Sequence, residues 1–224
     1  MKVTDKIEIT NEDNMELMAR YPDNYFDLAI VDPPYGIGMG AKNKGRQSKG
    51  QSIDKFDKPK YKTSEWDSAI PEKEYFTELF RVSKNQIIWG GNYFTELLPV
   101  SRGWVFWDKK PILPNYSAGE LAWTSFDCVL KRVVINWNGK IRTGIEKGYK
   151  SIHPTQKPIK LYSFLFNEYA KEGDKILDTH LGSGSIAIAC HNLGFELTAC
   201  ELDKDYYEAS IKRINNHIAQ QRLF

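Results

Sequence analysis

The sequence has few cysteines, no long hydrophobic run and almost no net charge. Its three cysteines, Cys128, Cys190 and Cys200, show no C-x-x-C spacing, so we expect reduced core residues and neither disulfides nor a cysteine metal site. No apolar stretch approaches the length of a membrane span, and the first ten residues are charged and alternating, which predicts a cytoplasmic location and no membrane partner. The net charge of +2 does not by itself indicate a nucleic acid partner.

The 224 residues are enough to bury one substantial core and are typical of a single α/β domain. We find no internal repeat and no low-complexity tract. A single domain over residues 1–224 is therefore the expected organisation.

A group of functional residues follows the apolar run at residues 28–31, which is typical of a buried strand. The next four residues are Asp32, Pro33, Pro34 and Tyr35. Ligands of open α/β sheets gather at the carboxyl ends of the strands, where Asp32 would lie. The prolines restrict the backbone, so the Asp32 carboxylate, the Pro33 carbonyl and the Tyr35 ring would face one point and would suit an amino group on a flat base. The alternative is a proline-rich turn with no ligand.

A second pattern lies near the end of the chain. Residues 175–178 read as a strand, Gly182, Ser183, Gly184 and Ser185 as a turn, and residues 186–192 as a helix. Glycines let a backbone approach a ligand closely, and a helix N-terminus offers free amide donors. Glu201 closes the next predicted strand, where an acid would bind ribose hydroxyls.

The same stretch also fits the G-x-G-x-x-A pattern of dinucleotide enzymes, through Gly182, Gly184 and Ala187. A nicotinamide oxidoreductase is disfavoured because only 39 residues (224 − 185) follow Ser185, too few for the rest of a doubly wound sheet. The remaining strands must come from upstream, so the catalytic half precedes the cofactor half.

The tetrapeptide, the glycine turn and their order resemble the β class of amino-methylating DNA methyltransferases. A third segment, His153-Pro154-Thr155-Gln156-Lys157-Pro158, resembles motif X of that family, although alone it would read as a proline-punctuated helix start. The resemblance implies a Rossmann-like, doubly wound, mostly parallel sheet of seven strands with a circularly permuted motif order. It also implies S-adenosylmethionine as cofactor and double-stranded DNA as substrate.

The resemblance assigns roles to individual residues. Asp32, Pro33, Pro34 and Tyr35 would be catalytic. The cofactor would contact Asp13, Asp32, His153, Thr155, Lys157, Asp178, Thr179, His180, Gly182, Ser183, Gly184, Ser185 and Glu201. Asp13 would also suit a helix N-cap. His180 stands where the family usually has Phe, and we expect no metal because no Cys or His cluster surrounds His153.

Two segments are candidates for DNA contact. A basic loop is expected at residues 36–66, since eight lysines and arginines face two aspartates between residues 36 and 62. A small target-recognition insert is expected at about residues 109–150. The predicted DNA-contacting residues are Lys42, Lys44, Arg46, Lys49 and Arg142. Because the insert is short, a homodimer is a further expectation, and a restriction endonuclease is the other partner considered.

The predicted reaction is methyl transfer to the exocyclic N6 of adenine in a base flipped out of the duplex. In the family, Asp before the prolines usually accompanies adenine. The alternatives are an N4-cytosine DNA methyltransferase, an RNA adenine methyltransferase and a non-catalytic methyltransferase-like subunit that binds nucleic acid.

Overall fold

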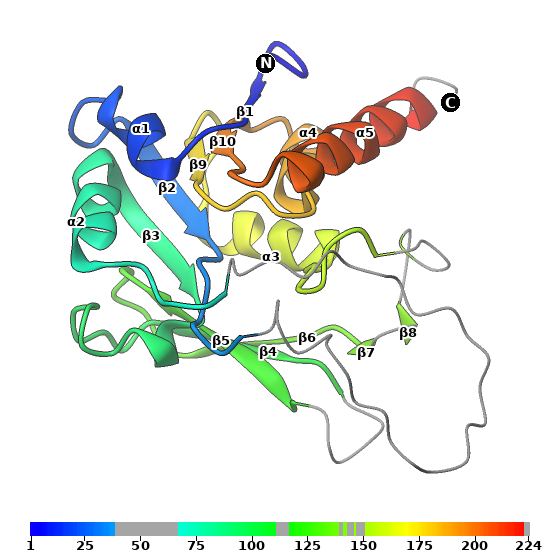
Figure 1. Ribbon diagram of the computed structural model, residues 1–224. Coiled ribbons are helices and arrows are strands. Elements are labelled where there is room, and N and C mark those ends of the chain that lie inside the picture. The colour runs from blue at the N-terminus through cyan, green and yellow to red at the C-terminus, as the bar shows by residue number, and fades with distance from the viewer. Residues whose placement is uncertain (39–66, 111–116, 139–140, 143–145, 147–150, 222–224) are drawn as a thin grey trace.

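The computed structural model describes residues 1–38, 67–110, 117–138, 141–142, 146 and 151–221. Helices and strands alternate along most of this chain (Figure 1). The elements are β1 (Ile7–Thr10), α1 (Asn14–Ala19), β2 (Phe26–Val31), α2 (Lys73–Val82), β3 (Ser83–Trp89), the 3-10 turn η1 (Gly91–Tyr93), β4 (Trp104–Asp108), β5 (Gly119–Thr124), β6 (Lys131–Val134), β7 (Trp137–Asn138), β8 (Ile141–Arg142), α3 (Ile159–Tyr169), β9 (Lys175–Asp178), α4 (Ser185–Leu193), β10 (Glu196–Cys200) and α5 (Lys204–Gln221).

The main sheet is mostly parallel, which confirms the predicted fold class. Its strand order is β1-β10-β9-β2-β3-β5-β4-β6, with β7 and β8 forming a separate pair. Strands β1, β10, β9, β2 and β3 are parallel, whereas β5 is antiparallel to both of its neighbours. The sheet has eight strands where seven were expected, because β6 adds a parallel edge beside β4.

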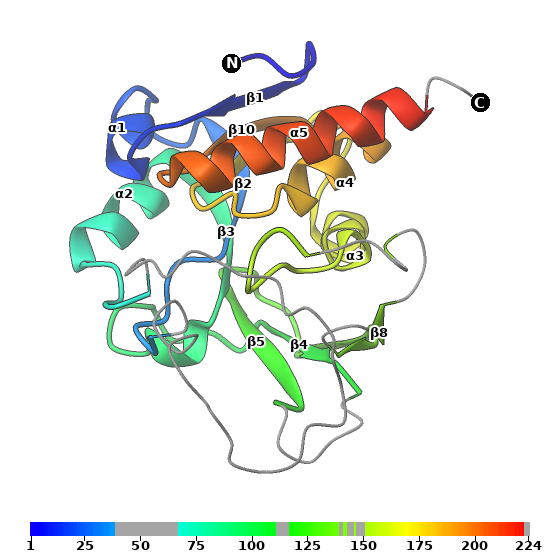
Figure 2. The same ribbon diagram turned by 45° about the vertical axis from the view of Figure 1, so that its right-hand side comes forward.

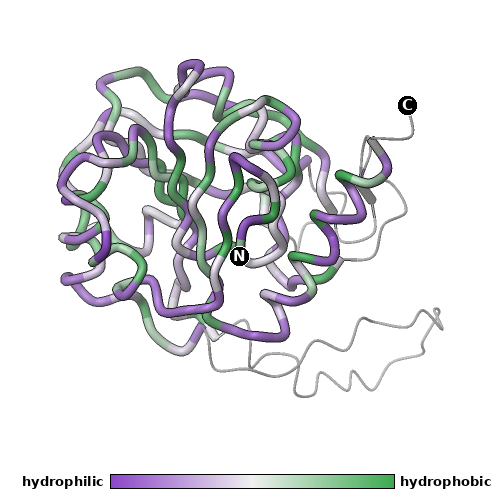
Figure 3. Tube along the Cα trace, turned by 90° about the horizontal axis from the view of Figure 1, so that it is seen from above, coloured by the Kyte–Doolittle hydropathy of each residue, from purple (hydrophilic) through white to green (hydrophobic). Residues whose placement is uncertain are grey.

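Helices cover both faces of the parallel part of the sheet, with α1 and α2 on one face and α3, α4 and α5 on the other (Figures 1 and 2). Such strands are apolar on both sides, and in β2 Ile30 packs into one core while Val31 packs into the other. Hydrophobic and hydrophilic residues alternate along helix α5, as the colours of Figure 3 show. Its buried residues Ser210, Ile214 and Ile218 recur every four positions.

The order of the sheet reverses between β9 and β2. From β2 the chain proceeds to β3 on one side, and from β9 it proceeds to β10 on the other. Strands β2 and β9 are parallel neighbours, with Leu28 opposite Ile176 and Ala29 opposite Leu177. Their carboxyl ends therefore meet at a topological switch point, the place where doubly wound sheets bind ligands.

Much of the insert predicted at residues 109–150 is part of the sheet. Residues 121–123, which fall within that range, lie in β5 between β3 and β4. Residues 131–134, also within that range, form β6. Among the described residues, no helix is both long enough and apolar enough to cross a membrane.

Candidate active site

A cavity of about 670 Å³ lies at the carboxyl ends of β2, β9 and β10. Its volume is in the range of pockets that bind cofactor-sized molecules. Residues from each predicted motif border it, together with side chains of α1 and α2. They include Asp32, Pro34, His153, Thr155, Lys157, Thr179, His180, Gly182, Ser183, Glu201, Glu12, Asn14 and Tyr75.

The predicted catalytic tetrapeptide begins directly after β2, as expected. The Tyr35 hydroxyl donates a 2.7 Å hydrogen bond to Oδ1 of Asp32. Burial raises the pKa of Tyr35 well above its usual value and Asp32 raises it further, so the hydroxyl keeps its proton and acts as the donor. The Tyr35 ring stacks on Tyr93, with ring centres 4.9 Å apart and planes 15° apart.

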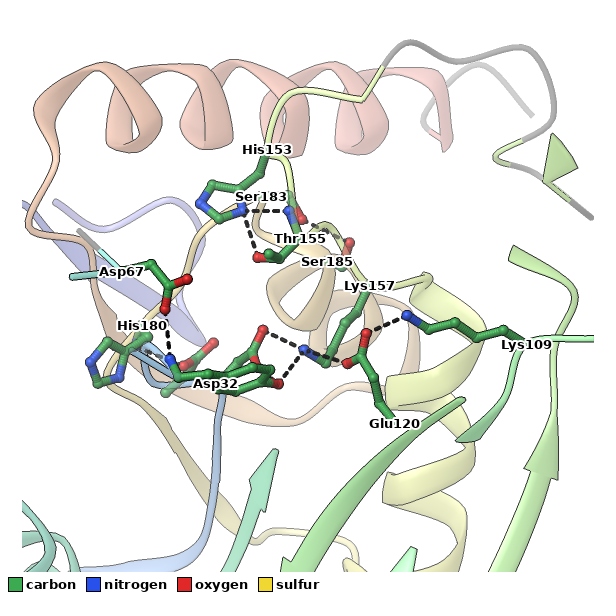
Figure 4. Close-up of polar contacts among 12 residues, drawn as sticks. Asp32, Asp67, Lys109, Glu120, His153, Thr155, Lys157, His180, Ser183 and Ser185 are labelled. Atoms are coloured by element: carbon green, nitrogen blue, oxygen red, sulfur yellow. Dashed lines mark hydrogen bonds and ion pairs between the residues drawn. The ribbon is translucent and has the colours of Figure 1, made fainter. Parts of the chain in front are cut away.

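Asp67 holds the backbone of this motif and was missed by the sequence analysis. Its Oδ1 accepts the amide N–H of Tyr35 at 2.8 Å and that of Gly36 at 2.9 Å, as Figure 4 shows for one of these bonds. The side chain is buried although 32 positions separate it from Tyr35. No local pattern in the sequence marks this pairing, because an aspartate in a polar segment usually faces solvent.

Lys157, predicted to contact the cofactor, lies against the carboxylate of Asp32, the predicted catalytic acid. Its ammonium forms an ion pair with Oδ2 of Asp32, a second with Oε2 of Glu120 at 3.3 Å, and a 3.4 Å hydrogen bond to the Tyr35 hydroxyl (Figure 4). Burial alone would lower the pKa of Lys157, but attraction by Asp32 and Glu120 outweighs burial and raises it. Lys157 is therefore a cation in this site.

His153 and Thr155, from the same motif, border the opposite part of the cavity. The Nδ1 atom of His153 lies 3.0 Å from the Thr155 hydroxyl and 3.3 Å from its amide nitrogen. The ring packs edge-on against Tyr206 at 4.4 Å between centres. Burial lowers the pKa of His153 to about 3, so the ring is neutral at physiological pH.

The glycine turn lies where the sequence predicts it, between β9 and α4. Gly182 and Gly184 have φ angles of 53° and 73°, a conformation that side chains with a Cβ disfavour. Glu201 supports the turn, because one carboxylate oxygen accepts the Gly182 amide at 2.8 Å and the other accepts the Asp203 amide at 2.9 Å. Burial raises the pKa of Glu201, and these two bonds oppose the rise.

Asp178, Thr179 and His180 end β9 beside the turn. The Asp178 carboxylate accepts the His180 amide at 2.9 Å, and its pKa is raised to about 8 by burial, with Asp32 and Glu201 adding to the rise. The Thr179 hydroxyl lies 2.7 Å from the Tyr75 hydroxyl and 2.9 Å from Nδ1 of His180. Burial lowers the pKa of His180 to about 4, so this ring keeps the neutral, flat character of the Phe that it replaces.

Asp13 was predicted to contact the cofactor and to suit a helix N-cap, and it lies at the start of α1. Asp13 caps the helix by accepting the Met15 amide at 2.8 Å, and it does not border the cavity. Its neighbours Glu12 and Asn14 do border it. The N-cap expectation for Asp13 is confirmed, and Glu12 is the acid that faces the cavity.

Arg213 of α5 and Glu146 form a second support that the sequence analysis missed. Arg213 donates to the Ser183 carbonyl at 2.7 Å and to the Ser185 hydroxyl at 2.9 Å, and it pairs with Glu146 at 2.9 Å. The other oxygen of Glu146 accepts the amide of Ile159, the first residue of α3. The ion pair between Arg213 and Glu146 thus connects α5, the glycine turn and the start of α3.

The predicted DNA-contacting residues Lys42, Lys44, Arg46 and Lys49 lie outside the described residues, as does nearly all of the predicted basic loop. Arg142 belongs to β8, but its side chain is not among the described parts. Within the described ranges, no group of three or more His, Cys, Asp or Glu side chains could hold a metal ion.

Comparison with known proteins agrees with this geometry. A family model described as DNA methylase matches residues 131–212. The Type II methyltransferase M2.DpnII of Streptococcus pneumoniae is 24% identical, over 93% of this chain and 90% of its own. The Type II methyltransferase M2.LlaDCHI of Lactococcus lactis subsp. cremoris is 23% identical, over 92% of this chain and 88% of its own. The matching family model and these relatives support a relation of this chain to the amino-methylating DNA methyltransferases.

Solved structures of DNA methyltransferases share the fold of this chain. M1.HpyAVI in complex with SAM gives a TM-score of 0.58 at 19% identity, over 93% of this chain and 99% of its own. The cytosine-N4-specific PvuII DNA methyltransferase gives 0.58 at 14% identity, over 97% of this chain and 94% of its own.

Proposed function

We propose that this chain transfers a methyl group from S-adenosylmethionine to the exocyclic N6 of adenine in double-stranded DNA, acting as one methyltransferase domain. One observation carries the proposal. The Asp32-Pro33-Pro34-Tyr35 motif ends β2, the glycine turn follows the adjacent parallel strand β9, and both border one cavity at the switch point.

The residues around the cavity fit this cofactor. Two glycines with positive φ expose the turn backbone, and Glu201 retains acceptor lone pairs beyond the two amides that it holds. Glu201 would bind the ribose hydroxyls, the turn from Gly182 to Ser185 would lie against the methionine end, and His180 would pack on the adenine. When bound, S-adenosylmethionine supplies an electrophilic sulfonium methyl group.

The catalytic motif offers acceptors to an amino group. The nitrogen of an adenine amino group is a weak nucleophile because its lone pair is delocalised into the ring. The Asp32 carboxylate and the Pro33 carbonyl would accept its two N–H groups and favour a pyramidal nitrogen with a localised lone pair. Positioning and electrostatics would supply most of the acceleration. Tyr35 would contact the flipped base, while its hydroxyl holds Asp32.

Adenine is preferred over cytosine because Asp32 stands before the two prolines, the residue that usually accompanies adenine in proteins that the chain resembles. The similar PvuII structure, whose name gives it as cytosine-N4-specific, keeps N4-cytosine as the second candidate. Both bases present the same amino group to the same two acceptors.

The partners of the chain follow from the same proposal. Duplex DNA would be held by the lysines and arginines of residues 36–66 and by Arg142, since phosphate contacts come mainly from such side chains. A homodimer and a restriction endonuclease partner stay predictions.

The experiment is to incubate the purified protein with labelled S-adenosylmethionine and unmethylated duplex DNA, then identify the methylated nucleoside by mass spectrometry. We expect label in N6-methyladenine. Asp32→Ala should bind the cofactor as the wild type does but lose at least about 100-fold in transfer. Asp127→Ala is the matched control, because this aspartate has an 86% exposed side chain far from the motif in sequence.

Label in N4-methylcytosine would support the proposed mechanism but would show that the target base is cytosine. Label found only when RNA is supplied would show that the substrate is RNA instead of DNA. Full turnover by Asp32→Ala would contradict the proposed catalytic role, and cofactor binding without transfer to any nucleic acid would favour a non-catalytic subunit.

A further inference from the structure

The ammonium of Lys157 is surrounded by oxygen atoms of the protein itself. An ammonium group carries three N–H donors, and three acceptors surround this one: Oδ2 of Asp32, Oε2 of Glu120 and the Tyr35 hydroxyl oxygen. Only 2% of the side chain is exposed, although the residue borders the cavity. We propose that Lys157 is a positioning residue that orients the catalytic carboxylate, and that it is not a ligand of the cofactor. The proposal rests on the proposed function.

Lys157 and Tyr35 together fix the plane of the Asp32 carboxylate. Tyr35 donates to Oδ1 and Lys157 pairs with Oδ2, so the group cannot rotate without losing one of the two contacts. Each oxygen keeps a further lone pair for a substrate N–H. Catalytic hydrogen bonds depend on such orientation, and a misplacement of about 1 Å can reduce a rate by about 100-fold.

Glu120 holds Lys157 from the other side. Glu120 comes from β5 and also pairs with Lys109 at the end of β4, so two carboxylates alternate with two ammonium groups (Figure 4). The formal charges of these four groups cancel. Removing Lys157 would leave Asp32 and Glu120 as two partly buried carboxylates without their shared cation, and Asp32 would lose its fixed orientation.

The test separates cofactor binding from methyl transfer. For Lys157→Met we expect a dissociation constant for S-adenosylmethionine within about twofold of the wild type, measured by calorimetry. The single-turnover transfer rate should fall by about 100-fold. Lys160→Met is the matched control, because Lys160 lies three positions away and is exposed at the start of α3, and it should change neither value.

A second variant covers the case in which Lys157→Met does not fold. Glu120→Gln keeps Lys157 and Asp32 but removes the second anchor of the ammonium, so transfer should slow while cofactor affinity is unchanged. A wild-type transfer rate in a folded Lys157→Met protein would overturn the inference. If Lys157→Met does not fold, a wild-type transfer rate in Glu120→Gln would overturn it. So would a loss of cofactor affinity that matches the loss of rate.

The binding measurement needs no turnover. If the wild type methylates no nucleic acid, the proposed function fails. Cofactor affinity in Lys157→Met still decides whether Lys157 is a cofactor ligand.

Discussion

At the scale of single residues, Gly90 shows how closely the ring of Tyr35 is packed. Gly90 follows β3 with a φ of 71°, and a Cβ at this position would lie 2.2 Å from Cε1 of Tyr35. The ring therefore lies directly against the backbone of this turn, between the end of β3 and the stacked ring of Tyr93. No side chain larger than hydrogen can stand at Gly90 unless Tyr35 moves.

Gly90→Ala should therefore displace Tyr35 and reduce methyl transfer by at least about 10-fold, with loss of about 1–3 kcal/mol of unfolding free energy from the strained backbone. Gly173→Ala is the control, because Gly173 has a φ of 87° but a Cβ there would have no neighbouring atom within 4 Å. Both variants should lose stability in urea titrations, and only Gly90→Ala should lose single-turnover activity. Equal activities in the two variants would show that the position of the Tyr35 ring is unimportant for transfer.

At the scale of elements, the glycine turn depends on helix α5. Arg213 links this helix to the Ser183 carbonyl and the Ser185 hydroxyl, and its partner Glu146 caps the start of α3 through the Ile159 amide. The turn is thus held from behind by a group that does not border the cavity.

Arg213→Met should weaken cofactor binding by at least about 10-fold and lower the unfolding free energy by about 2–3 kcal/mol, because it leaves the buried Glu146 carboxylate without its cation. Lys212→Met, which removes an exposed charge from the same helix, should leave both quantities unchanged. Calorimetry and urea titration measure the two effects. Normal affinity in a destabilised Arg213→Met protein would mean that the turn keeps its shape without this contact.

The elements that could be predicted from sequence are those with a strong local signal. Strand β9 has the predicted bounds, and β10 ends at Cys200, directly before Glu201, because apolar runs end at turn residues. The antiparallel place of β5 could not be predicted, since pairing partners leave no mark on a short strand. Three contacts join residues that are far apart in the sequence. Asp67 and Tyr35 are separated by 32 positions, Lys157 and Asp32 by 125 (157 − 32), and Arg213 and Glu146 by 67 (213 − 146). Only the folded chain brings such groups together.

At the scale of the whole molecule, the fold places several carboxyl groups at one edge of the sheet. Asp32, Asp178 and Glu201 follow or end three strands whose carboxyl ends lie together, and Asp178 is 2% exposed. Burial and these neighbours raise the pKa of Asp178 from its usual 3.8 to about 8. The folded protein therefore holds a proton there that the unfolded chain releases near pH 4.

The contribution of Asp178 to stability is present at low pH and is lost as the pH rises toward 8. In this window the unfolding free energy of the wild type should fall by roughly 1 kcal/mol per pH unit relative to Asp178→Asn, whose amide oxygen can still accept the His180 amide. Urea titrations at pH 5.5, 6.5 and 7.5 measure the difference. Parallel stability curves for the two proteins would contradict a protonated Asp178.

The strand order also constrains when the site can form during synthesis. Strand β2, which leads into the Asp32-Pro33-Pro34-Tyr35 motif, is made before its neighbour β9, which begins at Lys175, and among the described strands β1 pairs with β10, which begins at Glu196. Because a chain emerges from the ribosome N-terminus first, β1 and one edge of β2 wait unpaired until the last strands appear. Newly made chains therefore leave these strand edges unpaired until β9 and β10 have been made, and the cavity can form only then.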